Sequence, residues 1–151
     1  MTPDQYQTFT ATLLANLSAD PRVLGLIAAG SMAGTHHQPD QWSDHDFWIV
    51  TEPGAQEHFR TIFDWLPHAD QIVFTMRETE HGLKLLYADG HFVEYAVFAP
   101  EELAVTKINA YKILLDRERI AARVNEVRAA TVTWAAERKV DDAFLFGQFI
   151  T

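Results

Sequence analysis

The spacing of apolar residues along the 151-residue chain predicts two helices in its first half. A helix is expected over residues 2–18, where one apolar stripe is formed by Tyr6, Phe9, Leu13 and Leu17. Thr2 is a suitable N-cap for this helix, because Gln5 stands where it can complete a capping box. A second helix is expected from Gln56 to Leu66, with a stripe formed by Phe59, Ile62, Phe63 and Leu66.

Five short apolar or alternating runs predict strands. The run Val23 to Ala29 is continuously apolar and is followed by Gly30, which is typical of a strand buried on both faces. The pair Asp89-Gly90 lies between two apolar runs and predicts a hairpin. The other predicted strands are His45 to Val50, Gln71 to Arg77, Leu83 to Tyr87 and Phe92 to Phe98, and the polar stretch Gly34 to Trp42 is expected to be a loop.

The chain from Pro100 onward is predicted to be mainly helical. It carries two more stripes at helical spacing, Ala104, Ile108, Tyr111 and Leu115 and then Ile120, Val124, Val127, Thr131 and Trp134. The last residues, AFLFGQFIT, are unusually apolar for a free tail. They pack on the core, or bury against a second copy or another protein, or the natural chain continues beyond Thr151.

This order of elements predicts an α/β fold with a mixed sheet of about five strands and flanking helices. Several strands follow one another through short connections, which excludes an all-parallel sheet. We expect residues 1–99 to form the α/β core and residues 100–151 a helical C-terminal extension packed on it, as a single compact unit.

Composition narrows the class of protein. The hydrophobic fraction of 48% is that of a globular protein. The chain has no cysteine, which excludes disulfides, thiolate zinc and cysteine nucleophiles and suits a reducing compartment. The first residues lack a signal-peptide pattern and no apolar run is long enough to cross a membrane, so we expect a soluble, cytoplasmic protein with no membrane partner.

The formal net charge of −9 argues against binding to duplex nucleic acid, since that affinity comes from Lys and Arg. Eight of the 12 basic residues lie between Lys107 and Lys139, so the first hundred residues are strongly acidic. An acidic protein still binds a small nucleotide when metal ions neutralise the phosphates. Small metal-chelated nucleotides therefore remain candidate ligands.

The candidate chemistry lies around two carboxylates at the start of the second predicted strand. Asp44 and Asp46 are two positions apart, so in a strand both side chains leave the same face. Neighbouring carboxylates repel each other, and a divalent metal such as Mg²⁺ relieves that repulsion. The alternative is a pair of solvated aspartates at a strand entrance.

Gly30 and Ser31, directly after the first predicted strand, are candidate phosphate-binding residues. Glycine lets a phosphate approach the backbone closely, and amides at the start of a turn favour an anion. The serine adds a hydroxyl donor. The alternative is that Gly30 serves only a tight turn.

Together these residues resemble the signature of the nucleotidyltransferase superfamily related to DNA polymerase β. The resemblance rests on Gly30-Ser31 after an apolar strand and on Ser43-Asp44-His45-Asp46 opening another, and covers about residues 23 to 98. It is similar to the smaller members, the antibiotic and minimal nucleotidyltransferases. The turn here has Met32 where many relatives carry an arginine.

The resemblance implies a Mg²⁺-dependent enzyme that transfers a nucleoside monophosphate, AMP from ATP, to a hydroxyl. The acceptor would be a small molecule, such as an aminoglycoside-type antibiotic, or a protein. Asp44 and Asp46 would bind a two-metal site. The family places a third acid on a later strand, and Glu94 fits that position as a metal ligand or as the general base.

Other interpretations remain at this point. The fold could serve as a catalytically weak binding module, an antitoxin-like partner of a helical protein, or the chain could be the catalytic half of a longer antibiotic-modifying enzyme. The seven histidines are scattered, which disfavours a zinc site, and His45 is expected to be a core residue. Trp48 shares the face of the two acids and is expected to pack there or border the site.

Overall fold

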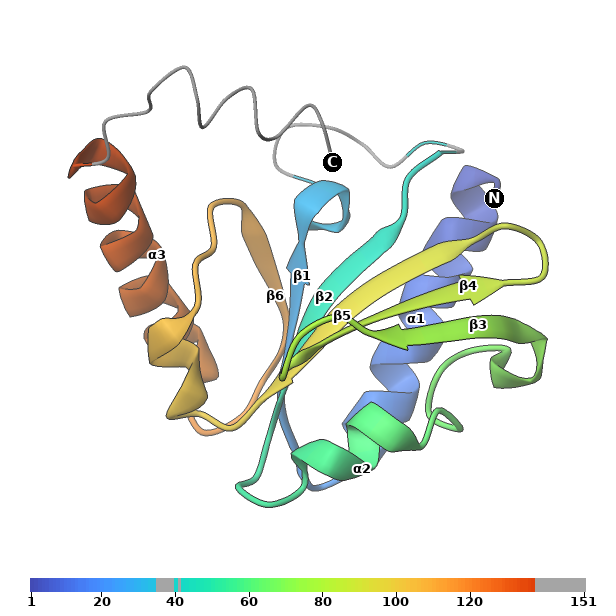
Figure 1. Cartoon of the computed structure of the whole chain (residues 1–151), viewed down its shortest axis with the longest axis horizontal. Coiled ribbons are helices and arrows are strands. Elements are labelled where there is room, and N and C mark those ends of the chain that lie inside the picture. Colours follow the sequence, from blue (N-terminus) through green and yellow to red (C-terminus); the bar gives the residue numbers. More distant parts are fainter. Residues whose placement is uncertain (35–39, 41, 138–151) are drawn as a thin grey trace.

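Figure 1 shows the computed structural model of the protein, in which residues 1–34, 40 and 42–137 are described. The described residues form three α-helices, six strands and three short 3-10 helices. The α-helices are α1 (Pro3–Ala19), α2 (Gln56–Thr61) and α3 (Ile120–Glu137). The strands are β1 (Val23–Ala29), β2 (His45–Thr51), β3 (Ile72–Arg77), β4 (Gly82–Tyr87), β5 (Phe92–Phe98) and β6 (Tyr111–Asp116), and the 3-10 helices are η1 (Gly30–Ala33), η2 (Ala69–Gln71) and η3 (Glu102–Val105).

All six strands form one sheet in the order β3-β4-β5-β2-β1-β6. The central neighbours β2 and β5 are parallel, and the other neighbouring pairs are antiparallel. The predicted α/β architecture with a mixed sheet is therefore confirmed. The sheet has one strand more than the five that the sequence predicted.

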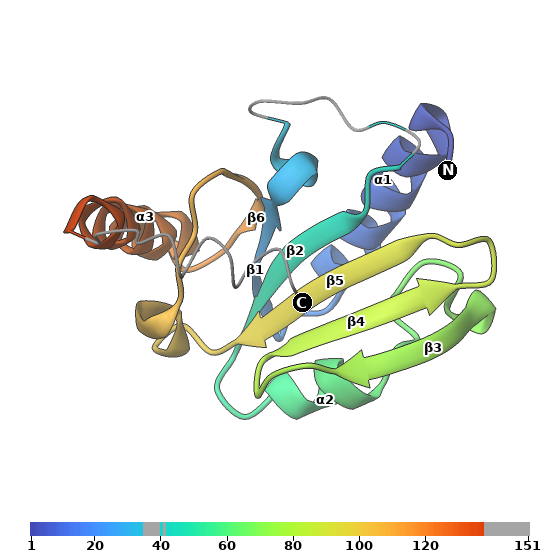
Figure 2. The ribbon, with the colours of Figure 1, turned by 45° about the horizontal axis from the view of Figure 1, so that its top comes forward.

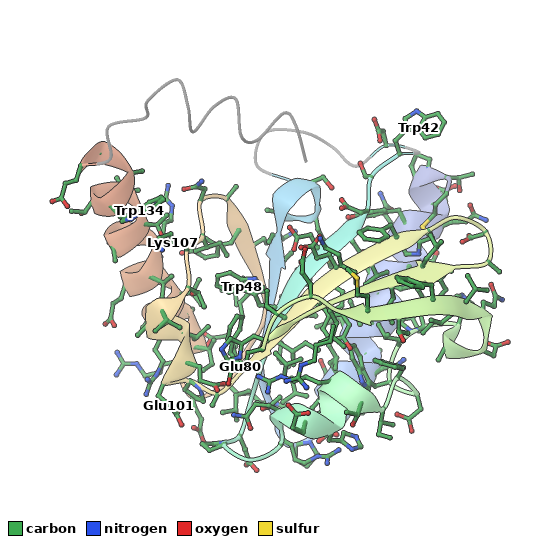
Figure 3. The ribbon with its side chains drawn as sticks, viewed as in Figure 1. Trp42, Trp48, Glu80, Glu101, Lys107 and Trp134 are labelled. Atoms are coloured by element: carbon green, nitrogen blue, oxygen red, sulfur yellow. The ribbon has the colours of Figure 1, made fainter. Side chains whose placement is uncertain are left out.

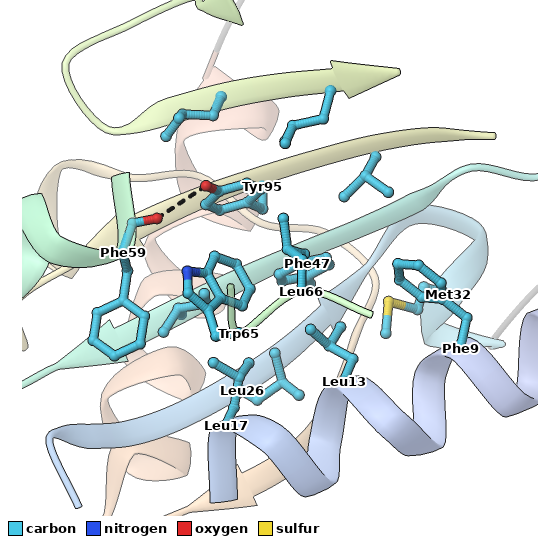
Figure 4. Close-up of a cluster of buried hydrophobic side chains, with 14 of the residues drawn as sticks. Phe9, Leu13, Leu17, Leu26, Met32, Phe47, Phe59, Trp65, Leu66 and Tyr95 are labelled. Carbon is cyan, nitrogen blue, oxygen red and sulfur yellow. Dashed lines mark hydrogen bonds between the residues drawn. The ribbon is translucent and has the colours of Figure 1, made fainter. Parts of the chain in front are cut away.

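One face of the sheet is covered by α1 and α2. The apolar stripe of α1 is buried against the sheet as predicted, and Phe59 of α2 joins the same cluster. Figure 4 shows this cluster, in which the Tyr95 hydroxyl donates a hydrogen bond of 2.9 Å to the carbonyl oxygen of Phe59. The predicted N-cap is also confirmed, because Thr2 and Gln5 form both bonds of a capping box.

The opposite face is covered by α3 and η3, but only over β1 and its neighbours. Ile120 and Val124 of α3 pack with Ile27 and Leu103 in a second apolar cluster. A Cβ on Gly25 of β1 would lie 2.8 Å from the Ile120 side chain, so the glycine lets the helix approach the sheet. Figure 2 shows α3 beside β6, away from β3, β4 and β5.

This leaves the α3-side face of β3 and β4 without a helix over it in the part of the chain that the structure describes. Phe74 and Met76 are exposed there, and their Cα partners on β4 are Leu86 and Lys84. β3 is also an edge strand of the sheet. An open, partly apolar surface therefore lies beside the candidate acids of β2 and β5.

The second predicted helix is shorter than expected. α2 ends at Thr61, and Ile62 adopts an extended conformation with its side chain 44% exposed. Trp65 and Leu66 are buried through a turn instead, with the Trp65 indole donating to the Ile62 carbonyl at 2.6 Å. A turn before Pro67, and not a helix, buries these apolar residues. The prediction of a helix to Leu66 was therefore wrong.

The prediction of a helical stripe through Ala104, Ile108, Tyr111 and Leu115 in a mainly helical C-terminal third was also wrong. The stripe from Ile120 does form α3, but residues 111–116 form the edge strand β6, antiparallel to β1. Tyr111 and Ile113 pack on the α3 side of the sheet, and Leu115 packs on the α1 side because the register shifts between them. The fully buried β1 needs a hydrogen-bonding neighbour on its second edge, which β6 supplies. β6 thus belongs to the same sheet as the strands before residue 100.

None of the helices among residues 1–34 and 42–137 is long and apolar enough to cross a membrane. The apolar end AFLFGQFIT, and most of the predicted loop from Gly34 to Trp42, lie outside the described residues.

Candidate functional site

The turn after β1 places a glycine against an acid of the neighbouring strand. Gly30 has a φ of +50°, which favours glycine, and a Cβ added to it would lie 3.0 Å from Asp46 Oδ2. The next residue, Ser31, has a buried hydroxyl close to that of Tyr6, and it forms no hydrogen bond of acceptable geometry in the described part of the chain. The predicted Gly30-Ser31 turn and the predicted acids are therefore neighbours in space.

β2 carries Asp46 on the face opposite His45, Phe47 and Ile49. His45, Phe47 and Ile49 are fully buried beneath the strand, whereas Asp46 is only partly buried. Asp44 lies one residue before the strand, where its carbonyl oxygen accepts a 3.0 Å hydrogen bond from the Tyr6 hydroxyl. Burial raises the pKa of Tyr6 to about 12, so the tyrosine stays a donor that fixes the start of the strand.

Glu94 lies directly beside Asp46, as the sequence predicted. β5 runs parallel to β2, and the register makes the two residues Cα partners. β5 is an interior strand between β4 and β2, so Glu94 is not an edge-strand acid, although 42% of its side chain is exposed. The structure thus brings together acids that are about fifty residues apart in sequence.

The proton affinities of Asp46 and Glu94 are raised in the folded protein. The pKa of Asp46 is raised to about 6, first by burial and then by the charges of Glu94 and Asp44. The pKa of Glu94 is also raised by burial, and a neighbouring lysine offsets part of that rise. A cation bound between the carboxylates would stabilise their ionised forms.

Lys84 is the site residue that the sequence analysis did not single out. It is the Cα partner of Glu94 on β4, and its Nζ lies 3.8 Å from Glu94 Oε2 and 2.6 Å from Glu78 Oε1. A hairpin centred on Asp89 pairs residues 84 and 94, so the predicted turn contained this signal. Lys84 can be identified as the partner of Glu94 only by counting the residue pairs of the hairpin outward from the turn.

The donor set fits a hard divalent cation such as Mg²⁺, because Asp44, Asp46 and Glu94 offer only carboxylate oxygens. The three side chains do not form a ready cage. No group of three His, Asp or Glu side chains within the described residues is arranged to hold a metal ion. The carboxylates would have to turn toward a common point to bind one.

The described histidines near the site are structural. His45 is fully buried, stacks on Tyr6 with ring centroids 3.8 Å apart, and its Nδ1 lies 2.8 Å from Nε2 of buried His91. Its Nε2 lies 2.9 Å from Thr10 Oγ1. This confirms His45 as a core residue, while His36 and His37 lie outside the described residues.

Two tryptophans border the site differently. Trp48 lies on the acid-bearing face of β2 and packs against Phe98, with ring centroids 5.3 Å apart. Trp42 projects from the chain before β2 and is 83% exposed (Figure 3). The packing expected for Trp48 is therefore found, and Trp42 is the more accessible of the two rings.

Comparison with known proteins adds no family to this description. No protein-family model matches the sequence, and no curated protein matches it significantly.

Proposed function

We propose that the protein is a metal-dependent nucleotidyltransferase that transfers a nucleoside monophosphate, AMP from ATP, to a hydroxyl of a small molecule or a protein. The observation that carries this proposal is the meeting of Gly30, Asp46 and Glu94 at one end of three adjacent strands. A turn that can bind a phosphate therefore lies beside a pair of carboxylates that can bind the metal ion of a metal-bound phosphate. The resemblance of the sequence motif to nucleotidyltransferases agrees with this arrangement.

Each group has a role in this proposal. Asp44, Asp46 and Glu94 hold Mg²⁺, which supplies charge neutralisation for the phosphates and for the attacking and leaving oxygens when it is bound. The backbone at Gly30 and the Ser31 hydroxyl receive the phosphates of the nucleotide. We assign Glu94 as a ligand because it lies directly beside Asp46 in the register of β2 and β5, and the Lys84 ammonium at 3.8 Å favours the ionised form that a ligand needs.

The test is Mg²⁺-dependent binding of a non-hydrolysable ATP analogue, measured by calorimetry. We expect Asp46→Asn and Glu94→Gln each to weaken binding at least about tenfold, because each removes a charged ligand. Asp64→Asn is the matched control, since Asp64 is an exposed acid that interacts with Arg22 and not with the candidate acids, and its replacement should leave binding unchanged. Binding that is absent in the wild type, or is equal in all four proteins, would contradict the proposal.

A second candidate function is a binding module without catalysis. The exposed apolar side chains of edge strand β3, Val73, Phe74 and Met76, favour it, because such an edge can accept another chain. A protein that binds no Mg²⁺ or nucleotide but forms a stable complex that Phe74→Lys abolishes would support this alternative.

A further inference from the structure

A row of charged residues crosses three neighbouring strands at one level of the sheet. Lys84 of β4 is the partner of Glu94 of β5, and Glu94 is the partner of Asp46 of β2. Alternation along each strand puts the three side chains on the same face, the one that α1 and α2 do not cover. The row ends at Gly30, which contacts Asp46.

Lys84 is held in this row by two acids. Its Nζ forms a 2.6 Å hydrogen bond with Glu78, which follows β3, and lies 3.8 Å from Glu94. Its side chain is 24% exposed, against 42% for Glu94, so the lysine is the less accessible of the two partners. The hydrogen bond to Glu78 raises the pKa of Lys84, which keeps the ammonium charged.

The ammonium and a bound metal would compete for the same carboxylate. An ion held by Asp46 and Glu94 would share Glu94 with Lys84, because Glu94 is the neighbour of both. Charges of like sign at this separation repel each other, so each cation weakens the binding of the other. Among the described residues, Lys84 is the only lysine or arginine that forms an ion pair with one of the three candidate acids.

We propose that Lys84 is a positioning residue of this site that acts as its internal counter-ion: anchored by Glu78, it holds the Glu94 carboxylate beside Asp46 and competes with a divalent cation for it. This inference rests on the proposed metal site. It assigns to β4 a part in tuning the affinity of a site whose ligands all come from β2, β5 and the residue before β2. Lys84 thereby stabilises the metal-free protein and lowers its affinity for the metal ion.

The test uses the full chain without nucleotide and Mn²⁺ as the probe, with free Mn²⁺ measured by electron paramagnetic resonance. We expect Lys84→Met to bind Mn²⁺ about two- to fivefold more tightly than the wild type, because a competing cation is removed. Lys84→Arg keeps the charge and should bind as the wild type does. Lys112→Met removes the same charge from β6, on the α1 side of the sheet, and should leave the affinity unchanged.

A second measurement separates this role from a purely structural one. In the absence of metal, Lys84→Met should melt at a lower temperature than the wild type, although it binds Mn²⁺ more tightly. If Lys84 had only a structural role, its replacement would lower both the melting temperature and the affinity for Mn²⁺. Equal or weaker Mn²⁺ binding by Lys84→Met, with clear binding by the wild type, overturns this inference alone, whereas no binding by any of the four proteins overturns the proposed metal site as well.

Discussion

Gly30 is the single residue on which the geometry of the candidate site depends most. Its backbone is in the left-handed region, and the space that a side chain would fill is taken by the Asp46 carboxylate. Gly34 closes the same 3-10 turn with a φ of +65°, but among the described residues no atom beyond its own chain neighbours lies within 4 Å of the position of its missing Cβ. The two glycines therefore share a backbone requirement and differ in their contact with an acid.

Gly30→Ala and Gly34→Ala should separate these two effects. We expect both variants to lose about 1–2 kcal/mol of unfolding free energy, because alanine is strained at positive φ. Gly30→Ala should lose more, and it alone should weaken Mn²⁺ binding, since the added methyl group displaces Asp46. Urea denaturation and Mn²⁺ titration measure the two quantities, and equal metal binding by both variants would show that the Gly30 contact does not position Asp46.

Among the elements, the edge strand β6 is joined to the rest of the core by its pairing with β1 and by one arginine that follows the strand. Nη1 of Arg117 donates to the carbonyl oxygens of Asp20 and Val23, each at 2.9 Å, and Nη2 donates to that of Ser18 at 2.7 Å. These carbonyls belong to the end of α1 and the start of β1. One side chain thus joins an edge strand to residues almost a hundred positions earlier.

Arg117→Met should destabilise the protein by about 2 kcal/mol, because partly buried carbonyl groups lose a charged donor. Arg123→Met is the matched control: it removes the same charge from an exposed position of α3 and should change stability little. Thermal melting of both variants gives the comparison. Similar melting temperatures would indicate that water replaces the arginine at these carbonyls.

In the molecule as a whole, the stability at acid pH depends on a buried pair of histidines that joins α1 to the sheet. His45 of β2 contacts Tyr6 and Phe9 of α1 and lies within hydrogen-bonding distance of His91, next to the hairpin turn. Burial is the largest cause that lowers the pKa of His45 to about 3 and that of His91 to about 4. Both rings are therefore neutral in the folded protein at pH values where an unfolded chain already binds protons.

The sign of the pH dependence follows from these lowered values. Above the ordinary histidine pKa of about 6.5, neither the folded nor the unfolded state binds these protons, and the full stability is present. Below that pH the unfolded state binds protons first, so the free energy of unfolding falls as the pH drops toward 4. We expect a loss on the order of 2–4 kcal/mol over this range. Asp46 acts in the opposite direction. Its pKa is raised to about 6, so its protonation below that pH removes the cost of a partly buried charge and increases stability.

His91→Gln should make this pH dependence shallower, because glutamine can bond to His45 without titrating. Urea denaturation at several pH values between 7.5 and 4.5 measures the slope. His58→Gln, on α2, is the control and should parallel the wild type. A His91→Gln slope as steep as that of the wild type would assign the acid sensitivity to other groups.

Much of the fold could be predicted because the relevant signals are local. The boundaries of β1 matched its continuous apolar run, and the capping box of α1 formed where Thr2 and Gln5 indicated. The hairpin formed at Asp89-Gly90, where Gly90 has a φ of +86°. The resemblance implied an acid on a later strand beside those of the second strand, and the parallel pairing of β5 with β2 does put Glu94 next to Asp46.

The predictions that were wrong concerned segments whose local pattern fits two structures. Tyr111 and Leu115 lie on a stripe of helical spacing, and the short apolar run that contains them also suits a strand; pairing with β1 decided for the strand. Phe63 to Leu66 also fit a helical stripe, and the turn before Pro67 decided otherwise. In both segments a neighbour distant in sequence, or the path of the backbone, outweighed the local spacing.

The sequence by itself determined which residues are buried on β1 and α1, where the chain turns, and which acids and which glycine are available for chemistry, because these depend on short-range periodicity and residue type. Only the tertiary structure decided that Glu94 lies between Asp46 and Lys84, that Gly30 contacts Asp46, and that β6 completes the sheet. These relations depend on strand order and register. Both are set by the packing of segments far apart in the chain, which local patterns do not encode.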